Sequence, residues 1–230
     1  MKTAIDNARF AFGDGVSQSD GVMVEPRRLP MQERSMRRRE AILVAAQDLL
    51  VTENPEDLAM REVARRAEIS IGSLYQYFPS KPAILRALVL RNLDKVGALL
   101  RTEVHALLED HGGRPTIAQA VDRIIDAYVS HYRSHPEAIA VWAGAQADLE
   151  LRRLDVIDTR ATADFMVAPM MILLSSSDRD KILSAALLIT ELAGHAIRLA
   201  IALEPPLTDR IVAQFKTMVI AVLEANRELN

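Results

Sequence analysis

Hydroxyl-bearing and small residues gather in one stretch of the chain, residues 59–78. Within it, Ser70, Gly72, Ser73, Tyr75 and Tyr77 fall inside eight consecutive positions. Tyrosine hydroxyls can reach phosphate oxygens, and small residues let a backbone come close to the edges of bases. The combination favours contact with a nucleic acid.

Two short helices joined by a tight turn are predicted to position these side chains. The first has one apolar stripe at helical spacing, formed by Met60, Val63, Ala64 and Ala67. In the second, Leu74 and Phe78 stand four residues apart, and Ser70 is placed to cap the helix start. Such a pair fits the helix-turn-helix pattern, in which the second helix enters the major groove. Spacing alone leaves open an ordinary helical pair whose tyrosines cover a core.

Basic residues complete the predicted interface. A cluster at the entry to the preceding helix forms either an arm toward the DNA backbone or minor groove, or a solvated helix start; it comprises Arg34, Arg37, Arg38 and Arg39. Lys81 opens the following helix, where its charge can meet phosphates, and Ile71 can pack on a thymine methyl group. The residues predicted to contact DNA are Arg37, Arg38, Arg61, Ser70, Ile71, Gly72, Ser73, Tyr75, Gln76, Tyr77 and Lys81.

A wider set of residues agrees with this interpretation. The set comprises Arg39, Ile42, Ala45-Ala46, Leu49-Leu50, Val63-Ala64, Ala67, Ile69-Ser70, Gly72-Ser73-Leu74-Tyr75, Tyr77-Phe78 and Lys81. Over residues 37–88 it closely resembles the signature of the tetracycline-repressor-like (TetR) family of bacterial transcription regulators. The sequence departs from the family at Ala59, where a threonine or serine is usual, at Glu68, the usual turn glycine, and at Ile71, often basic. These departures concern the operator sequence and affinity more than the fold.

The net charge of −3 is divided unevenly along the chain. Residues 27–95 include 13 basic and 9 acidic residues, giving +4, whereas residues 96–230 include 13 basic and 18 acidic ones, giving −5. The basic excess therefore accompanies the motif. This favours phosphate contact at one end and keeps the remainder off the DNA.

The composition predicts an all-α protein. Half of the 230 residues are hydrophobic, and no strand-like alternation of any length is present. The absence of cysteine excludes disulfides and thiolate sites. The longest apolar run, residues 165–174, contains Pro169 and is too short to span a bilayer. Since no signal segment opens the chain, we expect a cytoplasmic location without membrane contact.

Three segments are expected. Residues 1–30 form a disordered tail, residues 31–95 a three-helix DNA-binding head, and residues 96–230 a helical bundle for dimerisation and effector binding. Met1, Met23 and Met31 are each possible first residues of the protein. One long helix runs from Pro82 to the break at Gly112 and connects head and bundle as a lever. Further helices are predicted at residues 117–133, 137–147, 149–174, 178–203, capped by Ser176 or Ser177, and 208–229.

The last two predicted helices are apolar on more than one side. Residues 182, 186, 189, 193, 196 and 200 form one stripe, and residues 183, 187, 190, 194, 197 and 201 form another. One side would face the core and the other a second copy of the chain, or both would be buried within one monomer. A homodimer, which the family resemblance also implies, would place two recognition helices in successive major grooves of a palindromic operator.

An effector pocket is expected among the body helices, as the resemblance implies. Its predicted lining comprises Tyr128, Tyr132, Trp142, Met166, Met170, Thr190, Glu191 and His195, with His131, His135, Met171 and Arg198 on the same helices. The pairs His131/His135 and Glu191/His195 have i, i+4 spacing, but neither forms HExxH, and no metal or other cofactor is expected.

These patterns predict a dimeric, ligand-responsive transcription regulator, with repression inferred from the family's habit. One alternative is a DNA-binding protein of this fold that answers to a protein partner or to no ligand. The other is an all-α enzyme that uses the histidine and glutamate pairs. No nucleophile, phosphate loop or dinucleotide motif in the sequence supports this alternative.

Overall fold

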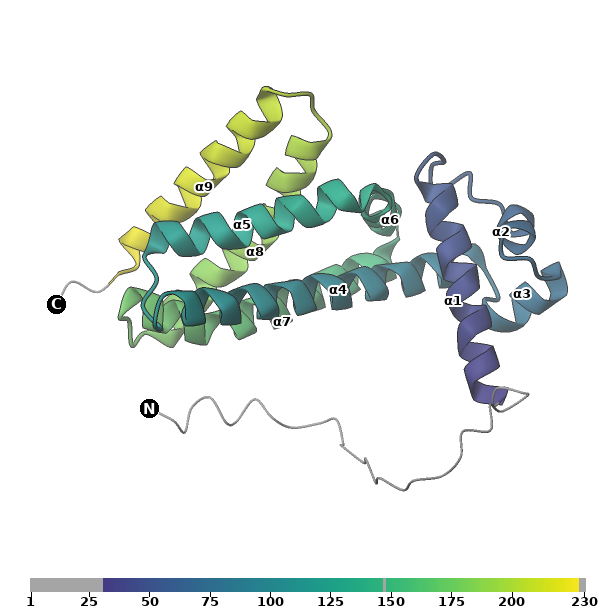
Figure 1. The fold of residues 1–230 in the computed structure, drawn as a ribbon, viewed down its shortest axis with the longest axis horizontal. Helices are drawn as coiled ribbons and strands as arrows, with labels where there is room; N and C mark the ends of the chain where they lie inside the picture. Colours follow the sequence, from purple (N-terminus) through teal and green to yellow (C-terminus); the bar gives the residue numbers. More distant parts are fainter. Residues whose placement is uncertain (1–30, 147, 228–230) are drawn as a thin grey trace, which may run out of the picture. The chain divides into compact units, whose positions relative to one another are not determined.

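The computed structural model describes residues 31–146 and 148–227, and these form helices with no strand (Figure 1). The all-α prediction is therefore confirmed. The predicted tail, the candidate starts Met1 and Met23, and the predicted helix end at Leu229 lie outside the described residues. Of the described residues, those in the ranges 36–146 and 148–227 belong to one compact unit. The helices of the described part are α1 (Met31–Leu50), α2 (Met60–Arg66), α3 (Ile71–Tyr77), α4 (Lys81–Asp110), α5 (Ile117–Ser134), α6 (Pro136–Gln146), α7 (Leu149–Leu174), α8 (Arg179–Ile201) and α9 (Leu207–Ala225).

The head helices α1, α2, α3 and the start of α4 share an apolar core, to which Val141 of α6 and Leu151 of α7 also belong. Ile42, Val63, Leu74, Ile84 and Leu88 are almost completely buried in it. Their positions follow the helical spacing in the sequence, so one side of each short helix is fixed to the core. The opposite side is left for other contacts.

The helix α4 connects this head to the body, as the sequence predicts. The Ser80 hydroxyl caps its start by accepting from the Ala83 amide at 3.4 Å, and Pro82 stands in its first turn, where the missing N–H costs nothing. It ends before Gly112 and Gly113, which adopt φ values of 57° and 78°. Glycine reaches this left-handed region without steric cost.

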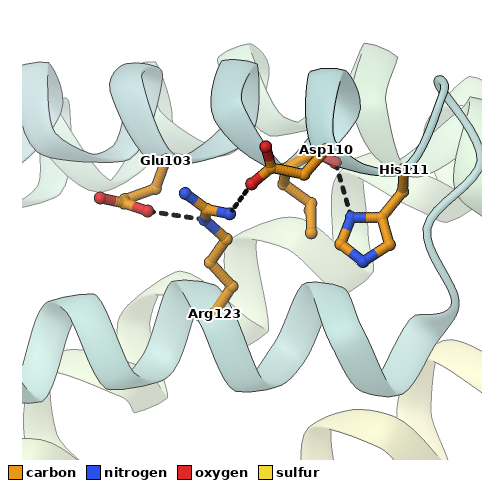
Figure 2. A network of polar contacts seen from close by, with 5 residues as sticks. Glu103, Asp110, His111 and Arg123 are labelled. Carbon is orange, nitrogen blue, oxygen red and sulfur yellow. Dashed lines mark hydrogen bonds and ion pairs between the residues drawn. The ribbon is translucent and has the colours of Figure 1, made fainter.

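The far end of α4 is joined to α5 by a bridging arginine. Arg123 of α5 donates from Nε to Glu103 at 2.8 Å and from Nη1 to Asp110 at 2.6 Å, both on α4 (Figure 2). These hydrogen bonds raise the pKa of Arg123. Beside them, the His111 ring Nδ1 lies 3.0 Å from the Leu107 carbonyl oxygen (Figure 2). The two helices are thus held together by charge as well as by apolar packing.

The body core is formed mainly by α5, α7, α8 and α9. Val129, Ala163, Leu174, Ile182 and Ile197 are among its buried members. The helix α8 contacts α5, α7 and α9. By length and composition alone α8 is apolar enough to cross a membrane, but here part of its apolar surface, including Ile182 and Ile197, is buried against those three helices.

One sequence prediction about α8 is wrong. The cap is Asp178, whose side chain accepts from the Lys181 amide at 2.9 Å, rather than Ser176 or Ser177; the Ser176 hydroxyl instead accepts from the Asp178 amide. The residues of the two predicted stripes are buried or half-buried within the chain, because α8 has three neighbouring helices, and this agrees with the alternative in which one monomer covers both. The apolar side chains left exposed on α8 belong to a third row, Leu188, Leu192 and Leu199.

Candidate nucleic-acid interface

The turn between α2 and α3 is closed by the backbone. The Ile69 amide donates to the Ala64 carbonyl at 3.0 Å, and Glu68 adopts a φ of 55°. In this left-handed region a side chain other than glycine costs about 1 kcal/mol. The position that the sequence marks as a departure from the family is therefore the strained position of the turn. Ala59, the other departure, precedes α2 and gives it no side-chain cap.

Two local features fix α3. The Ser70 hydroxyl accepts from the Ser73 amide at 3.1 Å, as the sequence predicts, and satisfies one of the free amides of the helix start. Leu74 is completely buried, and Phe78, just after the helix, is 4 % exposed. These side chains hold one face of α3 on the head core and turn the other face outward.

The outward face carries five of the eleven residues predicted to contact DNA. Ser70, Ile71, Gly72, Tyr75 and Gln76 are exposed. A Cβ atom added at Gly72 would meet nothing within 4 Å, so the backbone itself is accessible there. The face offers a phenol, a carboxamide and an aliphatic side chain around an open backbone, a set suited to the edges of bases in a groove.

Three further residues predicted to contact DNA, Ser73, Tyr77 and Lys81, are half-buried. Ser73 uses its amide for the cap, and the Tyr77 ring packs against the head core, so the alternative role that the sequence left open for the tyrosines applies in part to Tyr77. Lys81 donates from Nζ to the Glu56 carbonyl oxygen at 2.6 Å. This contact joins the start of α4 to the loop before α2 and uses one of the three ammonium donors.

The predicted arginines are placed on two helices. Arg37 and Arg38 lie inside α1 and are exposed, and Arg61 is exposed in the first turn of α2. The neighbouring Arg65 pairs with Glu62, donating from Nε at 2.9 Å, and this hydrogen bond lowers the Glu62 pKa. The exposed basic side chains therefore lie on the two helices that precede α3 in the chain.

One residue of the arginine cluster has a role that the sequence did not indicate. The Arg39 guanidinium of α1 lies over the Phe78 ring, 5.5 Å from its centroid. The contact connects α1 to the end of α3, and cation–π contacts of this kind are worth about 0.5–1 kcal/mol at exposed sites. No local pattern joins these two positions, since they are far apart in the chain.

A polar junction connects the head to the body. Arg91 of α4 donates to Glu40 and Gln47 of α1, and Gln47 donates from Nε2 to Glu137 of α6 at 3.2 Å. Beside it, a Cβ atom at Gly144 of α6 would lie 2.9 Å from the Pro55 side chain of the head. A movement of α6 or α4 would therefore displace α1 and the loop before α2 directly.

The structure brings some of the predicted pocket residues together. The Tyr128 and Tyr132 rings of α5 meet edge to face at 5.1 Å, and the Trp142 ring of α6 meets His195 of α8 in the same way at 5.4 Å. Arg198 of α8 lies over the Trp142 ring, 3.3 Å from its centroid. An aromatic and cationic cluster therefore joins α5, α6 and α8.

The other predicted lining residues lie apart from this cluster. Met170 is buried in the body core and Met166 packs against that core, while Thr190 is half-buried. Glu191 is exposed and accepts from the Thr159 hydroxyl at 3.1 Å. None of the eight residues lines the cavity of about 10 Å³ at the head–body junction, which is bordered by Gln47, Leu88, Arg91, Asn92, Lys95, His135, Glu137, Ala138 and Val141. That space suits about one water molecule.

Two acids beside the aromatic cluster, Asp155 and Asp158, are not among the residues predicted from the sequence. Asp158 of α7 lies partly buried, and its pKa is raised to about 6, first by burial and then by the Asp155 and Asp94 carboxylates. Asp155 accepts from Gln146 at 3.2 Å. The available signal was spacing, because Asp158 falls four residues after the half-buried Leu154, on the inner side of α7.

Family models match both parts of the chain. A model described as "Bacterial regulatory proteins, tetR family" matches residues 42–88, and one described as "Tetracyclin repressor-like, C-terminal domain" matches residues 115–227. The first covers the helices around the α2–α3 turn. The second covers α5 to α9, which include the aromatic cluster.

Individual relatives agree with these matches. The HTH-type transcriptional regulator BetI of Rhizobium meliloti is 28% identical over 193 residues, which make up 82% of this chain and 91% of that protein. The HTH-type transcriptional repressor KstR of Mycolicibacterium smegmatis is 36% identical over 83 residues, 36% of this chain and 38% of that protein. The crystal structure of a TetR-family transcriptional regulator from Streptomyces coelicolor superposes with a TM-score of 0.62 at 25% identity, covering 84% of this chain and 98% of that one.

Proposed function

Because this chain belongs to the TetR family of bacterial transcription regulators, we propose that it is a homodimeric repressor released from its operator by a small-molecule effector. It is a helix-turn-helix DNA-binding regulator and not an enzyme, as its relatives are transcription regulators. The observation that carries the proposal is the two-sided α3, whose Leu74 is buried while Tyr75 is 49 % exposed. The protein acts in the cytoplasm, where bacterial DNA lies.

The DNA contacts divide by chemistry. Gln76 and Ile71 face the base edges, the first through its carboxamide and the second through contact with a thymine methyl group. Tyr75 and Tyr77 donate to phosphates on the walls of the groove, and exposed Arg61 and Arg38 supply charge nearby. Phosphate contacts of this kind position the protein, whereas the first two side chains select the sequence.

A homodimer is supported by apolar surface on the last two helices. Leu188 and Leu199 of α8 are 52 % and 56 % exposed, and Met218 of α9 is 57 % exposed. Several large apolar side chains in one region mark a surface that another protein covers. A second copy satisfies it and presents two α3 helices to successive major grooves, which gives a palindromic operator.

Release of DNA uses the head–body junction. An effector changes the operator affinity only if it binds the two conformations of the protein differently. Binding between α5, α6 and α8 displaces α6, and Glu137 of α6 is connected through Gln47 to α1. Arg91 on α4 holds the same α1 residue. A shift in these two helices alters the separation of the two α3 helices.

A second mode of control has one observation in its favour. The helix α7 carries an exposed apolar row, Ile157, Phe165 and Ile172, at positions that share a helical face. A regulator controlled by a protein partner would use this row as its contact surface in place of the aromatic cluster. A regulator without a ligand would need no effector site in that cluster.

The experiment that tests the proposal is selection of genomic DNA fragments by the purified full-length protein at physiological salt, followed by sequencing. We expect an enriched palindromic site. Gly72→Val is the test variant, because Gly72 is exposed and its substitution blocks close approach without disturbing the core. Val156→Thr, at an exposed position of α7, is the control. Equal enrichment by Gly72→Val would remove α3 as the reading element, and enrichment of nothing would refute the regulator proposal.

A further inference from the structure

Arg198 lies in the body with its charge unmatched. Among the described residues it forms no ion pair, and its Nε is buried without a hydrogen-bond partner. Its side chain instead stacks on Trp142, whose indole Nε1 is also buried and unpartnered. Buried polar groups almost always have partners, so two orphan donors in contact with each other call for an explanation.

The surroundings of Arg198 favour an anion. Burial lowers the Arg198 pKa, and the nearby Tyr132 and Tyr128 hydroxyls offset part of this effect. Tyr132 is 3 % exposed, and its hydroxyl accepts a hydrogen bond from the guanidinium and can donate its own proton. Two unpartnered donors, the Arg198 Nε and the Trp142 indole N–H, therefore lie beside a tyrosine hydroxyl that can donate as well. An oxyanion accepts from all three types.

The neighbouring acids do not supply this anion. Asp155 is held by Gln146, and neither Asp155 nor Asp158 lies within ion-pair distance of Arg198 among the described residues. Since burial raises the Asp158 pKa to about 6, this carboxyl is in part neutral near physiological pH. The Asp155 carboxylate therefore offsets the guanidinium charge only in part, by raising the Arg198 pKa from a distance.

A glycine makes room for the guanidinium on its own helix. A Cβ atom at Gly194 would lie 3.0 Å from Nη1 and 3.2 Å from Nη2 of Arg198. Glycine inside a helix costs about 1 kcal/mol relative to alanine. At this position of α8 the cost is explained by the space that the folded-back Arg198 occupies.

One end of the aromatic and cationic cluster is exposed to solvent, and its other end is apolar. His195, one turn before Arg198, is exposed and touches the Trp142 ring edge, so solutes can approach from that side. On the other side Tyr132 belongs to the body core, with half-buried Ala193 and Ala196 nearby on α8. A ligand entering here meets charged donors at one end and apolar side chains at the other.

We propose that Arg198, Trp142 and Tyr132 bind the carboxylate of a small organic acid with an apolar body, and that such an acid is the effector. The effector role, but not the binding itself, rests on the proposed function.

The test uses the fluorescence of Trp142, the only tryptophan of the chain. Benzoate and hexanoate are titrated into the full-length protein, with benzamide and hexanamide as neutral matches. We expect a saturable change with at least one acid and binding roughly tenfold weaker or more for its amide. Equal responses to acid and amide, or no saturable response to either acid, would overturn the proposal.

Two variants locate the site. Arg198→Met keeps the apolar stem and should weaken acid binding roughly tenfold or more, while Arg152→Met, at an exposed position of α7, should not change it. Tyr132→Phe preserves the ring packing and should weaken binding about threefold to tenfold, which decides the matter if Arg198→Met does not fold. Wild-type affinity in Tyr132→Phe together with a folded, fully binding Arg198→Met would overturn the assignment.

Failure of the effector role can be told apart from failure of the site. Acid binding that leaves operator binding unchanged would keep the anion site and refute its effector role. Release of the operator by a neutral compound, in a protein that shows no saturable binding of either acid, would keep the repressor proposal and refute the anion site.

Discussion

Replacing Asp158 by asparagine should stabilise the protein by an amount that grows with pH. Its pKa is raised from 3.8 to about 6, with burial as the largest cause. A carboxyl whose pKa is higher in the folded than in the unfolded protein favours folding only while protonated. Its favourable contribution is complete below pH 3.8, falls as the pH rises, and is lost above about pH 6.

The magnitude follows from the size of the pKa shift. At 1.36 kcal/mol for each pKa unit, the shift of Asp158 corresponds to an upper limit of about 3 kcal/mol. Because solvent reaches part of the group, screening reduces this to about 1 kcal/mol. Asparagine has nearly the same shape and no charge, so it removes the pH-dependent penalty.

The assay is urea unfolding at fixed protein concentration, followed by circular dichroism between pH 4.5 and pH 7.5. We expect the free energy of unfolding of Asp158→Asn, relative to the wild type, to rise by about 1 kcal/mol across this range. Asp48→Asn, at an exposed position of α1, controls for the change in net charge. A difference that is constant with pH, or that shrinks as the pH rises, would refute the argument from burial.

Three further predictions concern the head and the dimer. Leu74→Ala, which empties a completely buried position, should lower the free energy of unfolding by about 2–5 kcal/mol. Tyr75→Ala, on the exposed face, should change it by less than about 0.5 kcal/mol and weaken DNA binding. Thermal melting measures the stability of each variant, and fluorescence anisotropy measures its DNA binding. Lys81→Ala should reduce the slope of log affinity against log salt by about 0.9, and an unchanged slope would restrict Lys81 to its contact with Glu56. Leu188→Glu should shift the dimer toward monomer in sedimentation velocity, and an unchanged sedimentation coefficient would place the interface elsewhere.

The helices of the head could be predicted because their signals are local. The Ser70 cap, the buried Leu74 and Phe78, and the uncapped start at Ala59 all depend on residues within one or two helical turns. The family resemblance marked Glu68 as a side chain where glycine is usual, but the positive φ of this residue came from the structure. Such positions are fixed by the short helix itself and change little with the tertiary structure.

The exposed side of α8 could not be predicted, since it depends on neighbours distant in sequence. Periodicity finds that α8 is apolar all round, but only packing against α5, α7 and α9 leaves Leu188, Leu192 and Leu199 uncovered. The cap at Asp178 shows a smaller difficulty of the same kind. Several hydroxyl and carboxyl side chains in a row can each cap a helix, and spacing does not choose among them.

The aromatic and cationic cluster was only partly visible in the sequence. Tyr128, Tyr132 and Trp142 were expected near a ligand, but nothing in the pattern joined Trp142 to Arg198, which lies two helices later. Contacts of this length are set by how helices cross, and no residue spacing records them.

The most direct test of the central claim is hydroxyl-radical footprinting of the protein on its selected genomic site. If α3 of each protomer reads the major groove, two protected patches related by two-fold symmetry should appear about one helical turn apart, roughly 10 base pairs. Both patches should disappear together for Tyr75→Ala, while that variant keeps its helical content. A single protected patch, or salt-sensitive protection without any preferred site, would contradict the account.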